Sequence, residues 1–308
     1  MHELSVSSKR MKFISRENID CQKWDDLVTN TPGASVFSLS SYLDEIAENW
    51  MVYVDENYTK GIAVPFAVRL GIKTCYTPIF ITKLEWLGAN QHELAQFGME
   101  VKDHFSIGNF CIRQRLENLK CLEFVEQAIP SESIISHGSQ AKRMINKSEK
   151  HAHRIEHSAD VSAIFSLIRS ELLPKISSLT EGSIHRMEKA IEKMSEQGHL
   201  QILSVFQGEN FVGGLFLIDF NQTVLYLKGA FTDDSKKNGA MYSAMNTAVQ
   251  QAFSEGKSFD FGGSRVEGVR HFNLQLGGLD RTYHCHQWDK SPLWYRWAKQ
   301  LRKALRKG

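Results

Sequence analysis

Two adjacent glycines followed by a serine form the most informative chemical feature of the sequence. They come directly after Phe259-Asp260-Phe261, as Gly262-Gly263-Ser264. The alternation at 259–261 predicts a strand with Asp260 on its polar face. Glycines let a ligand approach the backbone closely, and free N–H groups at the start of a helix expected near Val266 would point at that ligand. The pattern indicates a site for an anion or an acyl carbonyl, with a plain tight turn as the alternative.

Other common catalytic and binding motifs are missing. Gly262, Gly263 and Gly268 do not have the G-x-G-x-x-G spacing of a dinucleotide site, and the lysine of a P-loop is absent. No G-x-S-x-G occurs, and the histidines at 151–157 and 284–286 do not supply a four-ligand zinc pattern. Surface or core roles are therefore expected for the histidines, and no metal site is predicted.

A lone lysine, Lys228, ends the apolar segment Tyr226-Leu227 of a strand expected from residue 223. Lys228 faces the glycine pair if the strands at 223–230 and 258–263 are neighbours. A solvated strand end is the ordinary alternative for such a lysine. The next helix, expected over 238–255, begins after Lys236 and Lys237, and a helix N-terminus attracts phosphate.

The elements that position these residues occur in an order that is repeated along the chain. Three strands joined by turns, then a helix and a further strand, are expected at 51–113 and again at 200–261. This order predicts an internal duplication of one α+β unit. Chance recurrence of a common arrangement is the alternative. The segment 128–139, rich in Pro, Ser and Gly, predicts the boundary between domains 1–137 and 138–308.

The segment 238–278 resembles the C-terminal part of FemABX-type and related GNAT-fold acyltransferases. The matching residues are Asn238-Gly239-Ala240, a helix that ends at Gly256, then 259–264 and Gly268-Val269-Arg270-His271-Phe272. Weaker similarities are Ser35-Val36-Phe37-Ser38 and a basic helix at 142–147. The resemblance spans most of the chain, because the family is built of two GNAT-like halves. It implies an α+β fold of two tandem GNAT-like domains, each a mixed, mostly antiparallel sheet flanked by helices.

The resemblance further implies transfer of an activated acyl group from acyl-CoA or aminoacyl-tRNA to an amine. Such a site needs hydrogen-bond donors for an oxyanion, an anchor for phosphates and a proton acceptor. Splayed strands at 223–230 and 258–263 would supply the N–H donors. Asp260 is the candidate proton acceptor with His271 behind it, and capping of the following turn is the alternative for Asp260. The other expected site residues are Phe37, Gly262, Gly263 and Ser264 for substrate, Arg143, Lys147 and Lys228 for anionic groups, and Lys237, Asn238 and Gly239 for the donor's phosphates.

Charge is distributed unevenly along the 308 residues. The segment 290–308 holds seven basic residues and no acidic one, so the net charge of +2 is made of −5 for 1–289 and +7 for the tail. The tail from Pro292 onward predicts an amphipathic helix with Trp294 and Trp297 on its apolar face. Packing of these tryptophans onto the body is favoured, and contact with an anionic membrane or nucleic acid is the alternative.

Several classes of protein are disfavoured by composition. No apolar run is long enough to span a membrane, and 1–13 lacks the features of a signal peptide. The five scattered cysteines predict reduced thiols and a cytoplasmic protein, with contact at the inner face of the membrane left open.

Two functional hypotheses follow from the sequence. The first is an acyltransferase that forms an amide on an amino-bearing cell-envelope precursor, lipid-linked amine or polysaccharide, using acyl-CoA or aminoacyl-tRNA as co-substrate and no tightly bound cofactor. The second is a non-catalytic module that binds RNA or a membrane through its basic tail at 292–308, or a GNAT duplicate without activity.

Overall fold

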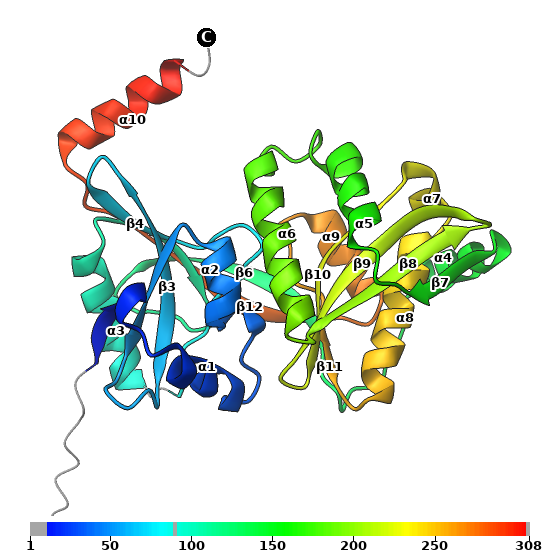
Figure 1. Cartoon of the computed structure of the whole chain (residues 1–308), viewed down its shortest axis with the longest axis horizontal. Coiled ribbons are helices and arrows are strands. Elements are labelled where there is room, and N and C mark those ends of the chain that lie inside the picture. The colour runs from blue at the N-terminus through cyan, green and yellow to red at the C-terminus, as the bar shows by residue number, and fades with distance from the viewer. Residues whose placement is uncertain (1–10, 89–90, 306–308) are drawn as a thin grey trace, which may run out of the picture. The chain divides into compact units, whose positions relative to one another are not determined.

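The computed structural model describes residues 11–88 and 91–305, in two compact units (Figure 1). Unit 1 comprises residues 1–123 and 283–308, and unit 2 comprises residues 124–282. Most of the segment 1–13, which bears on export, lies outside the described residues, as do Arg306 and Lys307 of the basic tail.

Unit 1 is built on a mixed sheet with strand order β1-β2-β3-β4-β5-β12, in which β4 and β5 are parallel and their neighbours antiparallel. Its elements are β1 (Lys12–Ser15), η1 (Arg16–Asn18), α1 (Cys21–Asn30), η2 (Val36–Ser38), α2 (Ser40–Ile46), β2 (Asn49–Val54), β3 (Gly61–Arg69), β4 (Ile72–Tyr76), α3 (Gln91–His104), β5 (Ile107–Ile112), most of β12 (Leu279–Asp289) and α10 (Leu293–Leu305).

Unit 2 has the same plan, with strand order β7-β8-β9-β10-β11-β6 and the parallel pair at β10 and β11. Its elements are most of β6 (Lys120–Ile129), α4 (Ser139–Lys150), β7 (His153–His157), α5 (Val161–Leu167), a π-helical turn η3 (Ile168–Leu172), α6 (Glu181–Glu196), β8 (Leu200–Gln207), β9 (Asn210–Phe220), β10 (Thr223–Phe231), α7 (Asp233–Lys237), α8 (Ala240–Ser254), β11 (Ser258–Asp260) and α9 (Glu267–Gln275).

The last strand of each sheet is exchanged between the two repeats. β6 follows β5 in the chain but pairs with β11 through Phe259 and Ile129. β12 follows β11 and α9 but pairs with β5, with Cys285 opposite Cys111. The division therefore differs from the single boundary expected between 137 and 138, because each sheet is completed by a strand from the other repeat.

Cys111 and Cys285 form a disulfide in unit 1. The expectation of reduced thiols is therefore wrong for this pair. Strand register explains the pairing, since the two residues are directly opposite on antiparallel strands although 174 residues separate them in sequence. Cys21, Cys75 and Cys121 are free thiols.

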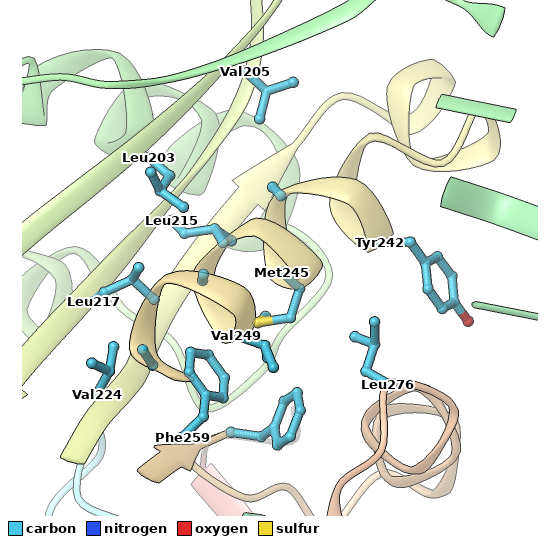
Figure 2. Close-up of a cluster of buried hydrophobic side chains, with 14 of the residues drawn as sticks. Leu203, Val205, Leu215, Leu217, Val224, Tyr242, Met245, Val249, Phe259 and Leu276 are labelled. Carbon is cyan, nitrogen blue, oxygen red and sulfur yellow. The ribbon is translucent and has the colours of Figure 1, made fainter. Parts of the chain in front are cut away.

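The core of unit 2 lies between its sheet and α8 (Figure 2). Met245 and Val249 of α8 pack with Leu215, Leu217 and Phe259 from the strands. β9 is buried on its opposite face as well, where Phe216 packs against Phe165 of α5 at 5.0 Å between ring centroids. A strand buried on both faces reads as a continuous apolar run, which explains the sequence at 211–218.

The C-terminal helix α10 exposes three large apolar side chains of its first turns to solvent. Leu293 is 71% exposed, Trp294 54% and Trp297 67%. The favoured expectation, that these tryptophans pack onto the body, is therefore wrong in this structure. Among the described helices, none is both long enough and apolar enough to cross a membrane.

Candidate functional site

A cavity of about 290 Å³ lies inside unit 2, where β10 and β11 diverge. Most of its wall is apolar, and its polar side chains are Tyr226, Lys228, Lys236, Ser264 and Asn273. The apolar and glycine positions of the wall are Leu172, Ile176, Leu227, Gly229, Ala230, Phe231, Met241, Phe261, Gly262, Gly263, Val269 and Phe272. This volume is at the small end of the range for ligand pockets, roughly 300 to 1,000 Å³, and suits an acyl group better than a whole cofactor.

The cavity arises because the parallel pairing of the two strands is short. β10 and β11 pair only over Thr223–Leu225 and Ser258–Asp260. β11 then ends, while β10 continues to Phe231. The register of β10 with β9 shifts between Tyr226 and Lys228, which places a bulge at Leu227. Beyond Leu225, backbone groups on this edge of β10 border the cavity instead of continuing the ladder with β11.

The glycine turn after β11 fits closely against β10. Gly262 has a φ of 76°, and a Cβ atom at this position would lie 2.5 Å from the Tyr226 carbonyl oxygen. The Gly262 N–H donates to Oδ1 of Asp260 at 2.8 Å. Only glycine satisfies both the left-handed backbone and the close approach. The structure thus brings together Gly262, Gly263, Ser264 and Lys228 along the wall of one cavity. This placement was expected if the strands at 223–230 and 258–263 are neighbours.

Lys228 is the cavity's distinctive charged group. No hydrogen bond or ion pair to its ammonium is formed within residues 11–88 and 91–305, and no Asp or Glu lines the cavity. Burial lowers the pKa of Lys228 because the surroundings disfavour its charged form. The other lysine of the wall, Lys236, instead pairs with Asp233 at 2.7 Å.

A buried amide network holds α9 at the cavity. The Asn273 side chain, 1% exposed, donates to Oε1 of Gln127 at 3.0 Å. Gln127 in turn donates to Asp280 at 2.7 Å, and Asp280 accepts from Arg270 at 2.5 Å. The hydrogen bond from Arg270 keeps the pKa of the Asp280 carboxyl below its usual range. These contacts fix the helix that supplies Val269, Phe272 and Asn273 to the wall.

Sequence reasoning did not assign a role to Asn273 or its partners. The available signal was a lone amide beside Phe272 and Leu276 in a short helix. Its partner Gln127 is 146 residues away in the chain, so the pairing is visible only in the folded protein.

Asp260 and His271, the expected proton acceptors, do not line the cavity. Asp260 accepts the Gly262 N–H, which is the turn-capping alternative for this residue. His271 is exposed, and its Nε2 lies 3.2 Å from Oε1 of Gln140.

The expected phosphate anchor at the start of α8 is in close contact with α4. Gly239 has a φ of 91°, and a Cβ atom there would overlap the Met144 carbonyl oxygen. Lys147 of α4 donates from Nζ to the Lys237 carbonyl at 2.9 Å. Lys237, Asn238 and Gly239 do not line the cavity. The glycine at 239 is required by the packing of the two helices.

The remaining expected substrate residues, Arg143 and Phe37, are not among the residues that line the cavity. Arg143 is an exposed residue of α4, close enough to Tyr242 to influence its titration. Phe37 belongs to unit 1, where it is 3% exposed and packs against Tyr42 at 5.5 Å between ring centroids. Its placement is that of a core residue of unit 1.

Histidines form pairs in the structure. The rings of His284 and His286 stack with centroids 6.3 Å apart, and those of His151 and His153 do so at 6.1 Å. Within the described ranges, no three His, Cys, Asp or Glu residues are arranged to hold a metal ion.

The segment that supplies most of the cavity wall matches a known protein family. Residues 137–272 match the family described as acetyltransferase (GNAT) domain. No curated protein matches the chain in sequence. The matched segment includes β10, β11 and the glycine turn.

Solved structures extend the likeness to most of the chain. FemX covers 89% of this chain and 97% of its own, with a TM-score of 0.61 at 11% identity. The C-terminal domain of a putative lysylphosphatidylglycerol synthetase from Agrobacterium fabrum covers 93% and 96%, with a TM-score of 0.55 at 10% identity. L-PGS from Bacillus licheniformis covers 88% and 92%, with a TM-score of 0.54 at 12% identity.

At these identities the likeness concerns the fold. It confirms the predicted α+β class with GNAT-like units in tandem, which the repeated strand order shows directly. Residues 137–272 therefore match the acetyltransferase (GNAT) domain family, within a fold similar to that of FemX.

Proposed function

We propose that this protein is an acyltransferase that moves an activated acyl group onto an amino group and forms an amide. The observation that carries the proposal is the cavity at the diverging ends of β10 and β11, inside the segment that matches the GNAT domain. Its wall combines an open strand edge, a glycine turn and two lysines, Lys228 and Lys236. These are the parts needed to hold an acyl carbonyl and an anionic group.

In the proposed reaction, the amine nitrogen attacks the acyl carbonyl carbon. The C–N bond forms, the bond from the carbonyl carbon to the donor's sulfur or oxygen breaks, and the proton that the nitrogen loses is taken up by the departing sulfur or oxygen. Negative charge develops on the carbonyl oxygen, where backbone N–H groups of β10 beyond Leu225 would stabilise it. Gly262 lets the turn approach the Tyr226 carbonyl oxygen of β10 closely, and both Gly262 and Gly263 line the cavity that would hold the acyl group.

Asp260 has a positioning role in this scheme. Its carboxylate holds the Gly262 N–H, so it fixes the turn that borders the acyl group. Neither Asp260 nor His271 lines the cavity. Proton acceptance by either side chain therefore stays a prediction from the sequence. Unchanged transfer by both Asp260→Asn and His271→Ala would exclude that prediction.

Aminoacyl-tRNA is the donor that we favour over acyl-CoA. The start of α8, which would receive the donor's phosphates, lies against α4 at Gly239 and Met144. The exposed surface of α4 carries Arg143 and Lys147, together with Lys142 and Lys150. Such a row of cations suits the many phosphates of a nucleic acid. One structural neighbour is named for lysylphosphatidylglycerol, an aminoacylated lipid, which supports an aminoacyl donor and a lipid-linked or cell-envelope acceptor.

A donor screen tests the proposal. Full-length protein is expected to be stabilised in thermal unfolding by an aminoacyl-tRNA, and to transfer its acyl group to an amine acceptor. The matched control is the same tRNA without its aminoacyl group, which should stabilise less because the cavity stays empty. Stabilisation and transfer with acyl-CoA alone would contradict the choice of donor. No transfer from either class would favour a GNAT duplicate without activity.

A second activity, binding to an anionic membrane surface, is favoured by α10. Its exposed Leu293, Trp294 and Trp297 alternate with the cations Arg296 and Lys299. Tryptophan beside basic residues is typical of helices that lie in the membrane interface. Contact at the inner face of a membrane would place the acyltransferase next to a lipid-linked acceptor.

Vesicle sedimentation measures this second activity. The full chain is expected to bind vesicles that contain phosphatidylserine and not vesicles of phosphatidylcholine alone, with binding lost at high salt. Deletion of 292–308 should abolish vesicle binding and leave donor binding in unit 2 intact. Retained vesicle binding after this deletion would contradict the role of α10, and tail-dependent binding to RNA but not to vesicles would assign the tail to nucleic acid.

A further inference from the structure

The charge balance of the cavity in unit 2 restricts which acyl group it can accept. Lys228 borders the cavity, and among the residues that the structure describes no acidic side chain does. Lys236, the second cation of the wall, has its counter-charge in Asp233. Within the described parts of the chain, Lys228 has no such partner. Lys228 is half-buried, and a cation that is partly removed from water without a partner is costly, so a bound anion would lower that cost.

The apolar residues of the wall also affect which ligand the cavity binds. Phe231, Phe261 and Phe272, with Leu172 and Ile176, make it apolar. An apolar wall favours the methylene part of a ligand, and a lone ammonium favours a negative terminus. A cationic terminus would meet both repulsion by Lys228 and the cost of burial.

We propose that this cavity selects an acyl group that carries a terminal carboxylate, and that Nζ of Lys228 pairs with that carboxylate. That the ligand is an acyl group rests on the proposed function. The inference adds the chemical class of that acyl group. It predicts that donors with acidic acyl groups are preferred and that donors with basic acyl groups are rejected. Rejection of basic acyl groups would exclude a lysyl group, which is the group in the name of one structural neighbour.

Binding of three small amides tests the proposal without any transfer step. Succinamate, butanamide and 3-aminopropanamide have similar length and end in a carboxylate, a methyl group and an ammonium, respectively. Isothermal titration of the full-length protein should give the tightest binding for succinamate, by about tenfold or more over butanamide, because a charge-assisted hydrogen bond is added. 3-Aminopropanamide should bind most weakly.

Two lysine variants separate Lys228 from general positive charge. Lys228→Met keeps the length of the side chain and should abolish the preference for succinamate, while Lys228→Arg should retain it. Lys236→Met removes the paired cation of the same wall and should leave the order of the three amides unchanged. Thermal unfolding of each variant shows whether it is folded.

Each contrary result has a defined meaning. Equal binding of succinamate by Lys228→Met and the unaltered protein would overturn the proposal, and so would preferred binding of 3-aminopropanamide. Inorganic phosphate that binds through Lys228 while succinamate does not would also overturn it, because the anion would then be a phosphate of the donor. Lys228-dependent binding of succinamate without transfer from any donor would support the pairing of Lys228 with a carboxylate and refute the proposed function, and with it the assignment of the ligand as an acyl group.

Discussion

Gly262→Ala is expected to remove most transfer activity and to lower the stability of unit 2. The new Cβ would lie 2.5 Å from the Tyr226 carbonyl oxygen, so the turn or β10 must move. The left-handed backbone at this residue adds about 1–2 kcal/mol of strain for a side chain. Because the displaced groups form the cavity wall, we expect kcat/KM to fall by about a hundredfold, since misplacement of about 1 Å has such an effect.

Gly256→Ala is the matched control for this change. Gly256 also has a positive φ, of 69°, but a Cβ atom there meets no atom within 4 Å. This variant should show the backbone strain alone, with transfer preserved. Kinetics and denaturant unfolding of both variants separate the two effects. Equal activity of Gly262→Ala and Gly256→Ala would refute the assignment of the glycine turn to the site.

Gln127→Leu is expected to destabilise unit 2 by about 2–4 kcal/mol. The substitution removes the acceptor of Asn273 Nδ2 and a donor to Asp280. Asn273 is 1% exposed and Gln127 is fully buried, so water cannot replace the lost partner without rearrangement. The free energy of unfolding in urea measures this loss. Release of α9 should also weaken ligand binding, because Asn273 and Phe272 line the cavity.

Two further variants make this prediction specific. Gln201→Leu removes a similar bond, 3.1 Å long, from the Gln201 amide to the Asp219 carboxylate. Gln201 is only half-buried, and Asp219 still accepts a hydrogen bond from Lys257 in this variant. We expect it to cost less than about 1 kcal/mol. The double variant Gln127→Leu with Asn273→Leu should recover part of the lost stability, because no buried amide is then unsatisfied. A double variant less stable than the sum of the single changes would contradict this account.

The cavity and the basic tail serve separable steps in the proposed activity. The cavity lies in unit 2, where it would bind the acyl group. The helix α10 belongs to unit 1 and would bind the membrane surface that carries the acceptor. Substitutions at Lys228 should therefore change which acyl group is used, and deletion of 292–308 should change where the protein binds.

Local sequence patterns predicted many of the elements that form the site. The strands at β10 and β11, the helix α8 and the glycine turn were expected from periodicity and from the glycine positions, and the structure has them. The amphipathic character of α10 was also visible in its sequence, although the exposure of its tryptophans was not.

Features that depend on distant segments were not predicted. β6 and β12 lie outside the expected repeat. Because they are exchanged, β6 pairs with β11 and β12 pairs with β5. The Cys111–Cys285 disulfide and the bond from Asn273 to Gln127 are consequences of this exchange or of the packing around it. The contact of α4 with Gly239 likewise gives that glycine a packing role that the helix-start pattern did not reveal.

The sequence by itself determined the local conformations: where strands and helices form, where the chain needs glycine, and that the order of elements is duplicated. These depend on side-chain periodicity and on backbone sterics within a few residues. Only the tertiary structure decided that Lys228 borders a cavity with no partner among the described residues, that Asp260 caps a turn and that strands are exchanged. The physical reason is that strand pairing and burial are set by contacts between residues far apart in sequence, which no local pattern specifies.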